Sequence, residues 1–215
     1  MTITDDFVKK LNTPVVTEVS DHTGRYHMED DGGVEIEVGE FLHGLVRILK
    51  PENILETGLY SAISCSYMAQ GLRDNGFGHL QSIEFEQKHI ERSKKRLDKL
   101  GLLKFVTINY QSSEDYVPDR KFEMIFLDSE PWLRFLELVR FLPSLKEGGF
   151  VLLHDLPNHM FQMPIEGKDF GWPWGKIPQE IVNLVKDKQL VPIYFPSPRG
   201  MTMLYKPTPA DYKFL

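Results

Sequence analysis

Apolar and polar positions alternate along this chain in a pattern that predicts strands and helices in turn. Short apolar runs are followed by longer segments whose apolar residues recur at the spacing of an amphipathic helix. Strands that alternate with helices predict a mainly parallel sheet with helices on both faces, which is the α/β class. The expected strands are 54–55, 80–85, 105–108, 122–128 and 150–155, and the expected helices are 34–49, one that begins at 63, 87–100, 132–145 and 177–187.

The last two apolar runs depart from this alternation. Residues 191–195 and 201–205 both have strand character, and the connection between them is too short to contain a crossover helix. The two strands must therefore form an antiparallel hairpin. The chain is expected to fold into a Rossmann-like, mainly parallel sheet of seven strands whose last strand is reversed.

The segment after the first expected strand is the main candidate for a ligand site. An acid, Glu56, and a glycine, Gly58, lie between this strand and the helix that begins at Ile63. A glycine turn lets the backbone approach a ligand closely, and a helix N-terminus offers free N–H groups, as in the nucleotide sites of α/β proteins. The alternative interpretation is an ordinary strand-to-helix corner.

Three later strands each end in a carboxylate or directly beside one: Glu84, Asp128 and Asp155. A single acid in such a place is often a helix cap or a loop ion-pair residue. That explanation is disfavoured for all three together, so the strand ends are candidates for a site.

An aromatic loop follows the fifth strand. Residues 156–176 contain several prolines and glycines together with Phe161, Phe170, Trp172 and Trp174. Long loops of this kind are typical of lids and binding loops, and the aromatic side chains favour burial over disorder. The alternative is that these rings close the rim of the core.

Composition narrows the class of protein. With 215 residues, 41% hydrophobic and 26% charged, the chain is expected to form one ordinary globular domain. A net charge of −6 argues against nucleic acid as a partner, and the basic cluster 94–96 is interpreted as a solvated helix face. A single cysteine, Cys65, excludes an internal disulfide and favours a reducing compartment. Without a signal peptide or a membrane-spanning apolar run, a cytoplasmic protein without membrane partners is expected.

Two motifs resemble one known family. Residues 37–42 read Glu-Val-Gly-Glu-Phe-Leu, and residues 56–64, which follow the next helix and strand, read Glu-Thr-Gly-Leu-Tyr-Ser-Ala-Ile-Ser. Both resemble class I S-adenosylmethionine-dependent methyltransferases, most of all the catechol and caffeoyl-CoA O-methyltransferase group and its bacterial small-molecule relatives. The similarity runs from Val34 to Lys206, and the reversed last strand is the hallmark of that fold. It implies an N-terminal arm over residues 1–33 and one methyltransferase domain over 34–215, with 156–176 as its substrate or lid loop.

The resemblance implies a site for S-adenosylmethionine. Backbone at Gly58 and Tyr60 is expected to lie against the methionine part, with Ser64 bonded to its carboxylate. Glu84 is expected to accept hydrogen bonds from both ribose hydroxyls.

Around these contacts the resemblance assigns further positions. Phe85 is expected on the adenine face, Ser113 at the adenine edge, Glu56 as a residue that orients the turn and the sulfonium end, and Asp128 as a further cofactor-binding residue. Ala62 occupies the position of the family's second glycine, where alanine narrows the room beside the cofactor and favours an ordinary negative φ.

The resemblance also implies a divalent metal, such as Mg²⁺, that holds and acidifies the acceptor hydroxyl. Asp128 and Asp155 match the two metal-binding aspartates of the group, whereas Leu156 replaces its asparagine. His154 is expected to complete the set as a ligand, or to serve as a general base. The alternative for His154 is a histidine hydrogen-bonded inside the fold, and His159 is the next candidate base. The expected catalytic residues are thus Asp128, His154 and Asp155.

The resulting expectation is a methyltransferase that acts on a hydroxyl of a small molecule, either phenolic, natural-product-like or sugar-like. Many members of the resembled group are homodimers, and the arm is a candidate dimer contact. The alternative is a binding protein that kept the fold and lost catalysis, to which Ala62 and Leu156 both point. A nicotinamide oxidoreductase is disfavoured because residues 56–62 lack the Gly-x-Gly-x-x-Gly pattern.

Overall fold

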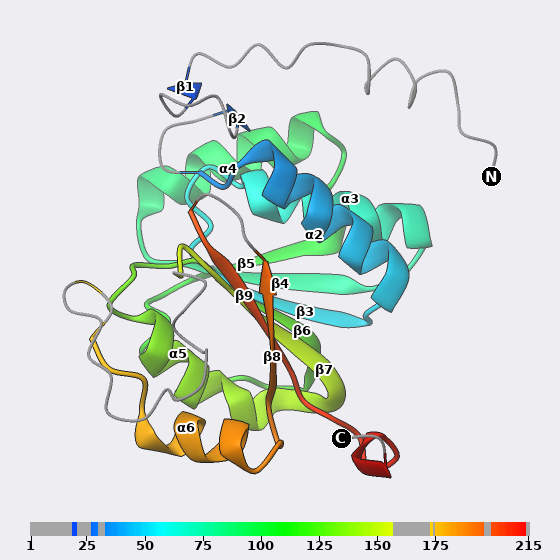
Figure 1. Cartoon of the computed structure of the whole chain (residues 1–215). Helices are drawn as coiled ribbons and strands as arrows, with labels where there is room; N and C mark the ends of the chain where they lie inside the picture. Colours follow the sequence, from blue (N-terminus) through cyan, green and yellow to red (C-terminus); the bar gives the residue numbers. More distant parts are fainter. Residues whose placement is uncertain are drawn as a thin grey trace.

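A seven-stranded sheet forms the centre of the molecule. A computed structural model of the chain describes residues 19–20, 27–29, 33–156, 173, 175–195 and 199–213. The strand order across the sheet is β5-β4-β3-β6-β7-β9-β8 (Figure 1). The strands are β3 (Asn53–Thr57), β4 (His79–Glu84), β5 (Val106–Tyr110), β6 (Phe122–Leu127), β7 (Leu145–His154), β8 (Val191–Phe195) and β9 (Met201–Tyr205).

The direction of the strands confirms the predicted fold class. β3 pairs in parallel with β4 and β6, and the neighbouring pairs β4–β5 and β6–β7 are parallel as well. β9 lies between β7 and β8 and is antiparallel to both. The sheet is therefore mainly parallel with a reversed last strand, and the carboxyl ends of β3, β4, β6 and β7 meet at one edge.

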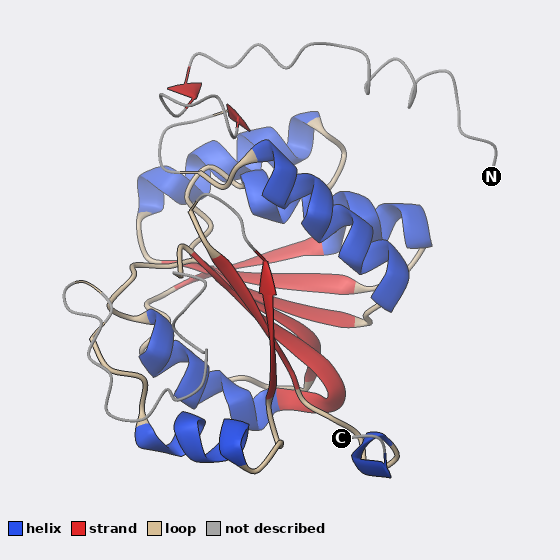
Figure 2. Ribbon diagram, viewed as in Figure 1, coloured by secondary structure: helices blue, strands red, loops and turns tan. Residues whose placement is uncertain are grey.

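Helices cover both faces of the sheet, as the alternation of the sequence predicts. One face carries α2 (Ile36–Leu49), α3 (Ile63–Asn75) and α4 (Gln87–Lys99), and the opposite face carries α5 (Arg134–Phe141) and α6 (Gln179–Lys186) (Figure 2). Three short 3-10 helices complete the described elements: Leu103–Phe105, Leu142–Ser144 and Asp211–Lys213.

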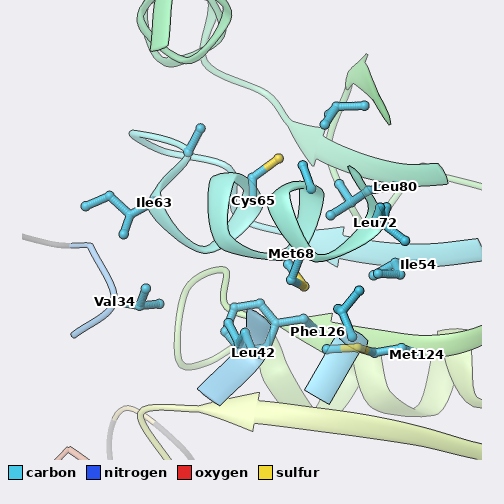
Figure 3. Packing of buried hydrophobic residues seen from close by; sticks show 14 of the residues in the cluster. Val34, Leu42, Ile54, Ile63, Cys65, Met68, Leu72, Leu80, Met124 and Phe126 are labelled. Carbon is cyan, nitrogen blue, oxygen red and sulfur yellow. The ribbon is translucent and has the colours of Figure 1, made fainter. Parts of the chain in front are cut away.

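Each face of the sheet has its own hydrophobic cluster. On the face of α2 and α3, Leu42, Met68 and Phe126 gather in a solvent-free centre (Figure 3). On the other face, Phe135 and Phe141 of α5 pack with Ile181 of α6. Full burial of one such side chain stabilises the fold by about 1.5–3 kcal/mol, so these clusters hold the strand ends in fixed positions.

The region between α5 and β7 differs from the prediction. The expected helix over 132–145 is shorter, because Pro143 cannot continue an α-helix and the chain passes into a 3-10 turn. The expected strand over 150–155 begins earlier, at Leu145, and includes Gly148 and Gly149. The two glycines exchange backbone hydrogen bonds with Lys206.

The N-terminal segment contributes one small pairing among the described residues. β1 (Val19–Ser20) and β2 (His27–Met28) are antiparallel, and Met28 forms a bridge to Glu35 at the start of α2. Most of the proposed arm, residues 1–33, and most of the aromatic loop over 156–176 lie outside the described residues, so the predicted domain division stays a prediction. In the part of the chain that is described, none of the helices is long and apolar enough to cross a bilayer.

Candidate active site

A cavity of about 580 Å³ lies at the carboxyl ends of β3, β4, β6 and β7. Its volume falls in the range of about 300–1,000 Å³ that is typical of small-molecule sites. Seven of the residues singled out in the sequence contribute to its wall: Gly58, Tyr60, Glu84, Phe85, Ser113, Asp128 and Asp155. The topology therefore brings the predicted strand-end acids together.

The turn after β3 needs a glycine at position 58 for two reasons. Gly58 has φ +82°, which is in the left-handed region that side chains disfavour. A Cβ atom at this position would also lie 2.3 Å from the carbonyl oxygen of Asp128. The turns after β3 and β6 thus touch at Gly58, and the backbone forms this part of the cavity wall.

The same turn holds two further residues with positive φ, Tyr60 at 44° and Ala62 at 58°. The expectation that Ala62 adopts an ordinary negative φ is therefore wrong. The conformation follows from the turn itself, in which the Ala62 N–H donates to the carbonyl of Leu59 at 2.7 Å, immediately before α3. Ala62 is completely buried in the core cluster of this face, so its methyl group packs inward. Strained backbone of this kind is common at functional sites.

Glu84 is fixed by backbone donors at the end of β4. One carboxylate oxygen accepts from the N–H groups of Phe85 and Glu86, both at 2.8 Å, and the other accepts from the Tyr60 N–H at 3.0 Å. The acid thus ties the turn after β3 to the end of β4. An ionised carboxylate has further lone pairs, so Glu84 can still accept hydrogen bonds from a ligand.

Two residues expected near adenine lie at the same end of the cavity. Phe85 is 60% exposed although its ring is large and apolar, and Ser113 is buried in the cavity wall. An exposed ring beside a cavity offers a face for stacking. Both positions are compatible with the expected roles.

Glu56 and Ser64 do not contribute to the cavity wall; they form a buried layer behind it. The Ser64 and Ser82 hydroxyls each donate to a different Glu56 oxygen at 2.6 Å. Burial raises the pKa of Glu56 to about 7, and these two hydrogen bonds oppose that rise. The structure thus supports an orienting role for Glu56, whereas the hydroxyl of Ser64 is occupied with this acid.

His154, at the end of β7, lies between two carboxylates. Its Nδ1 is 2.9 Å from Asp128 and its Nε2 is 2.7 Å from Glu35, and the side chain is 1% exposed. Burial by itself would lower the pKa of this imidazole, but Asp128, Glu35 and Asp155 raise it to about 9. The ring is therefore held as an imidazolium that donates from both nitrogens.

Two arginines complete this charged cluster. Arg134, at the start of α5, donates from Nη2 to Asp128 at 3.0 Å and to the Ser129 carbonyl at 2.8 Å. Arg199, in the segment before β9, donates to Asp155 at 2.6 Å and to the Gly33 carbonyl at 2.8 Å. Asp155 itself has φ +54°. The cluster joins the start of α2, the ends of β6 and β7, and the β8–β9 connection.

Sequence reasoning missed Glu35, Arg134, Arg199 and Glu137. The spacing of Arg134 was a signal in the sequence, because this charged residue lies four residues before Leu138 on the apolar side of its helix. Glu137 is a second buried charge on that helix, where it accepts from the Thr57 hydroxyl at 2.9 Å, and burial raises its pKa. Nothing in the sequence indicated that Glu35 or Arg199 would reach the site.

Comparisons with known proteins agree with this geometry. Residues 55–156 match a protein family described as a methyltransferase domain. The chain is 33% identical over 98 residues to a catechol O-methyltransferase of Niastella koreensis, a match that covers 43% of each protein. A mycobacterial relative is matched over 57% of its length. The chain thus spans about half the length of the curated relatives it matches.

Solved structures show the same fold. The Podospora anserina methyltransferase PaMTH1, determined with bound S-adenosylhomocysteine, is 19% identical and superimposes with a TM-score of 0.67 over 83% of this chain and 81% of that one. An O-methyltransferase from Bacillus cereus, also in complex with S-adenosylhomocysteine, is 17% identical with a TM-score of 0.64 over 82% and 84% of the two chains.

The fold and these relatives together define the class. The sheet order with its reversed last strand is that of the class I methyltransferases. The predicted resemblance to class I S-adenosylmethionine-dependent O-methyltransferases is confirmed, and residues 55–156 are the part of the chain that matches the methyltransferase-domain family.

Proposed function

We propose that this chain transfers a methyl group from S-adenosylmethionine to a hydroxyl oxygen of a small molecule. One observation carries the proposal: a single cavity is lined by the Gly58 turn with Glu84, which we name its first or cofactor end, and by Asp128 with Asp155, which we name its second or acceptor end. The first end suits a nucleoside with a ribose diol. The second end offers charged groups to a polar acceptor.

The residues of the first end fit the cofactor. Glycine at position 58 lets the turns after β3 and β6 meet in the cavity wall, since any side chain there would collide with the Asp128 carbonyl. Glu84 is preset by three backbone donors and would accept from the ribose hydroxyls, with Phe85 against the base. When bound, S-adenosylmethionine supplies an activated sulfonium methyl group, so the protein mainly has to orient the acceptor for in-line attack.

The second end favours a phenolic or similarly flat acceptor. Trp132 and Pro131 contribute to the cavity wall next to Asp128, and aromatic surfaces beside a few polar groups are typical of sites for such ligands. The curated relative from Niastella koreensis is described as a catechol O-methyltransferase. This supports a hydroxylated aromatic as the first acceptor class to test.

The predicted metal ligands do not fit a divalent ion well. Ligand atoms of Asp128, His154 and Asp155 lie within 4.8 Å of one another. However, both nitrogens of His154 face carboxylates, and Leu156, in place of an oxygen ligand, is buried in the core. No step of the proposed reaction is therefore assigned to a metal.

Calorimetric titration of S-adenosylhomocysteine tests the cofactor site. The wild-type chain should bind, and E84Q should weaken binding by at least about tenfold, the effect of losing one charge-assisted hydrogen bond. E91Q, which changes an exposed acid on α4, is the matched control and should bind as the wild type does.

Transfer itself is measured with methyl-labelled cofactor against a panel of catechols, other hydroxylated aromatics and sugars. Label recovered in an O-methyl product supports the proposal. Binding without transfer to any acceptor would favour the alternative of a binding protein that has lost catalysis. A chain that does not bind S-adenosylhomocysteine would contradict both.

A further inference from the structure

Arginine side chains lie at the acceptor end of the cavity, in the region where the resemblance implies a metal. Arg134 lies in the cavity wall next to Asp128 and Asp155. Its Nη2 is 3.0 Å from Asp128 and 3.9 Å from Asp155. One guanidinium thus approaches both of the aspartates that were expected to bind a divalent ion.

These aspartates also have other cationic neighbours. Arg199 lies 2.6 Å from Asp155, and His154 lies 2.9 Å from Asp128. Each of the two aspartates thus already has an arginine beside it, Arg134 next to Asp128 and Arg199 next to Asp155. A divalent cation added here would introduce uncompensated buried charge and would have to displace an arginine, which is unfavourable in a poorly solvated site.

Arg134 has donors that the described structure leaves unused. Its side chain is 2% exposed, yet Nε and Nη1 have no hydrogen-bond partner. Buried donors without a partner cost about 1–3 kcal/mol each. Arg134 therefore has hydrogen-bonding capacity beyond its contacts with Asp128 and Ser129.

We propose that Arg134 stabilises the reacting oxygen of the methyl acceptor as an oxyanion, and that methyl transfer by this chain is independent of a divalent metal. The inference rests on the proposed function and names the group that takes over the electrostatic role of the metal. Guanidinium is always charged and binds oxyanions well, so it is suited to this task.

The step is balanced in protons and electrons. The acceptor hydroxyl releases its proton to water, and Arg134 stabilises the oxygen anion that remains. The oxygen lone pair forms the new O–C bond while the S–C bond of the sulfonium breaks and its electron pair returns to sulfur. The products are a methyl ether and a neutral thioether. Neither a redox partner nor a further co-reactant is needed.

The first experiment measures metal binding without reference to activity. The full chain, stripped with EDTA and saturated with S-adenosylhomocysteine, is titrated with Mn²⁺ and followed by electron paramagnetic resonance. We expect no stoichiometric binding up to about 1 mM, a concentration that corresponds to a weak site. One tightly bound Mn²⁺ per chain, lost in D155N and kept in E91Q, would overturn the inference.

The second experiment measures the oxyanion directly. 4-Nitrocatechol changes its visible absorbance on ionisation, so titration of the S-adenosylhomocysteine complex in EDTA reports the pKa of the bound phenol. In the wild type this pKa should fall by at least one unit, a tenfold shift. In R134Q the shift should disappear, and in R134K it should return in part. R140Q is the matched control, because Arg140 lies on the same helix and donates to the Tyr116 carbonyl outside the site.

Turnover gives an independent measurement. R134Q should lower kcat by at least about 100-fold, the usual effect of removing one oxyanion donor, while affinity for S-adenosylhomocysteine stays within threefold. An equal loss of S-adenosylhomocysteine affinity would assign Arg134 to the cofactor instead. Unchanged ionisation of bound 4-nitrocatechol in R134Q, or no binding of this probe to the wild type, would contradict the inference. A chain that fails to bind S-adenosylhomocysteine at all would instead contradict the proposed function.

Discussion

The two ends of the cavity are built by different means. At the cofactor end, backbone geometry dominates: Gly58 brings two turns together, and Glu84 is held by three backbone N–H groups. At the acceptor end, side-chain charges dominate, with His154 and two arginines set among acids from separate elements. Backbone contacts to a ligand depend little on which side chains lie nearby. In a cluster of paired charges, each side chain depends on its neighbours, so a substitution at the acceptor end should destabilise several residues at once.

Removal of the central cation should have the largest effect. H154Q leaves Glu35 and Asp128 without their shared positive partner, and breaking a buried ion pair in this way costs about 3–5 kcal/mol. Urea unfolding should show this loss of stability. The double variant E35Q/H154Q also removes one of the two carboxylates left without a partner, so it should recover part of the lost stability. If H154Q cost less than about 1 kcal/mol, the description of a coupled cluster would be wrong.

At the cofactor end, G58A should be the next most disruptive change. The new Cβ would have to avoid the Asp128 carbonyl in addition to adopting φ +82°, for a combined cost of about 3 kcal/mol and the loss of S-adenosylhomocysteine binding. G76A separates the two causes, because Gly76 has φ +83° with open space around its Cβ position. It should cost about 1 kcal/mol and keep binding. Equal losses in both variants would show that the contact with Asp128 is irrelevant.

The buried layer behind the cavity should appear as a pH effect. Because burial raises the pKa of Glu56 from 4.5 to about 7, the folded chain holds this proton more tightly than the unfolded chain. The contribution of protonated Glu56 to the free energy of unfolding is present in full below pH 4.5. It is lost as pH rises to about 7, a change of up to about 3 kcal/mol. Urea unfolding of the wild type and E56Q between pH 4.5 and 8 measures the difference. Parallel stability curves for the two proteins would refute this effect.

A62G should have the smallest effect. Glycine relieves the left-handed φ of 58° at position 62, but it also loses a buried methyl group and gains freedom in the unfolded chain. These contributions oppose one another, so the free energy of unfolding should change by less than about 1 kcal/mol. The affinity for S-adenosylhomocysteine should change by less than threefold. A gain in affinity of tenfold or more would show that the alanine methyl group does restrict the cofactor.

Much of the fold could be predicted because it depends on local pattern. The apolar runs gave strands close to those observed, and the short connection between β8 and β9 required a reversed strand. The errors lie where local rules compete: Pro143 shortens α5, and β7 begins before the expected residue 150, with Gly148 and Gly149 paired to Lys206. The conformation of Ala62 was mispredicted because the turn, and not the residue type, sets its φ.

The sequence by itself determined the α/β class, the glycine turn and the strand-end acids Glu84, Asp128 and Asp155, because these follow from periodicity and residue type. Only the tertiary structure decided what surrounds those acids. Glu35 and Arg199 come from segments far apart in the chain, and they meet His154 and Asp155 only because β7 lies next to β9 beneath the start of α2. Charge pairing across such distances leaves no trace in local spacing. Whether an acid binds a metal or pairs with an arginine is therefore settled by packing.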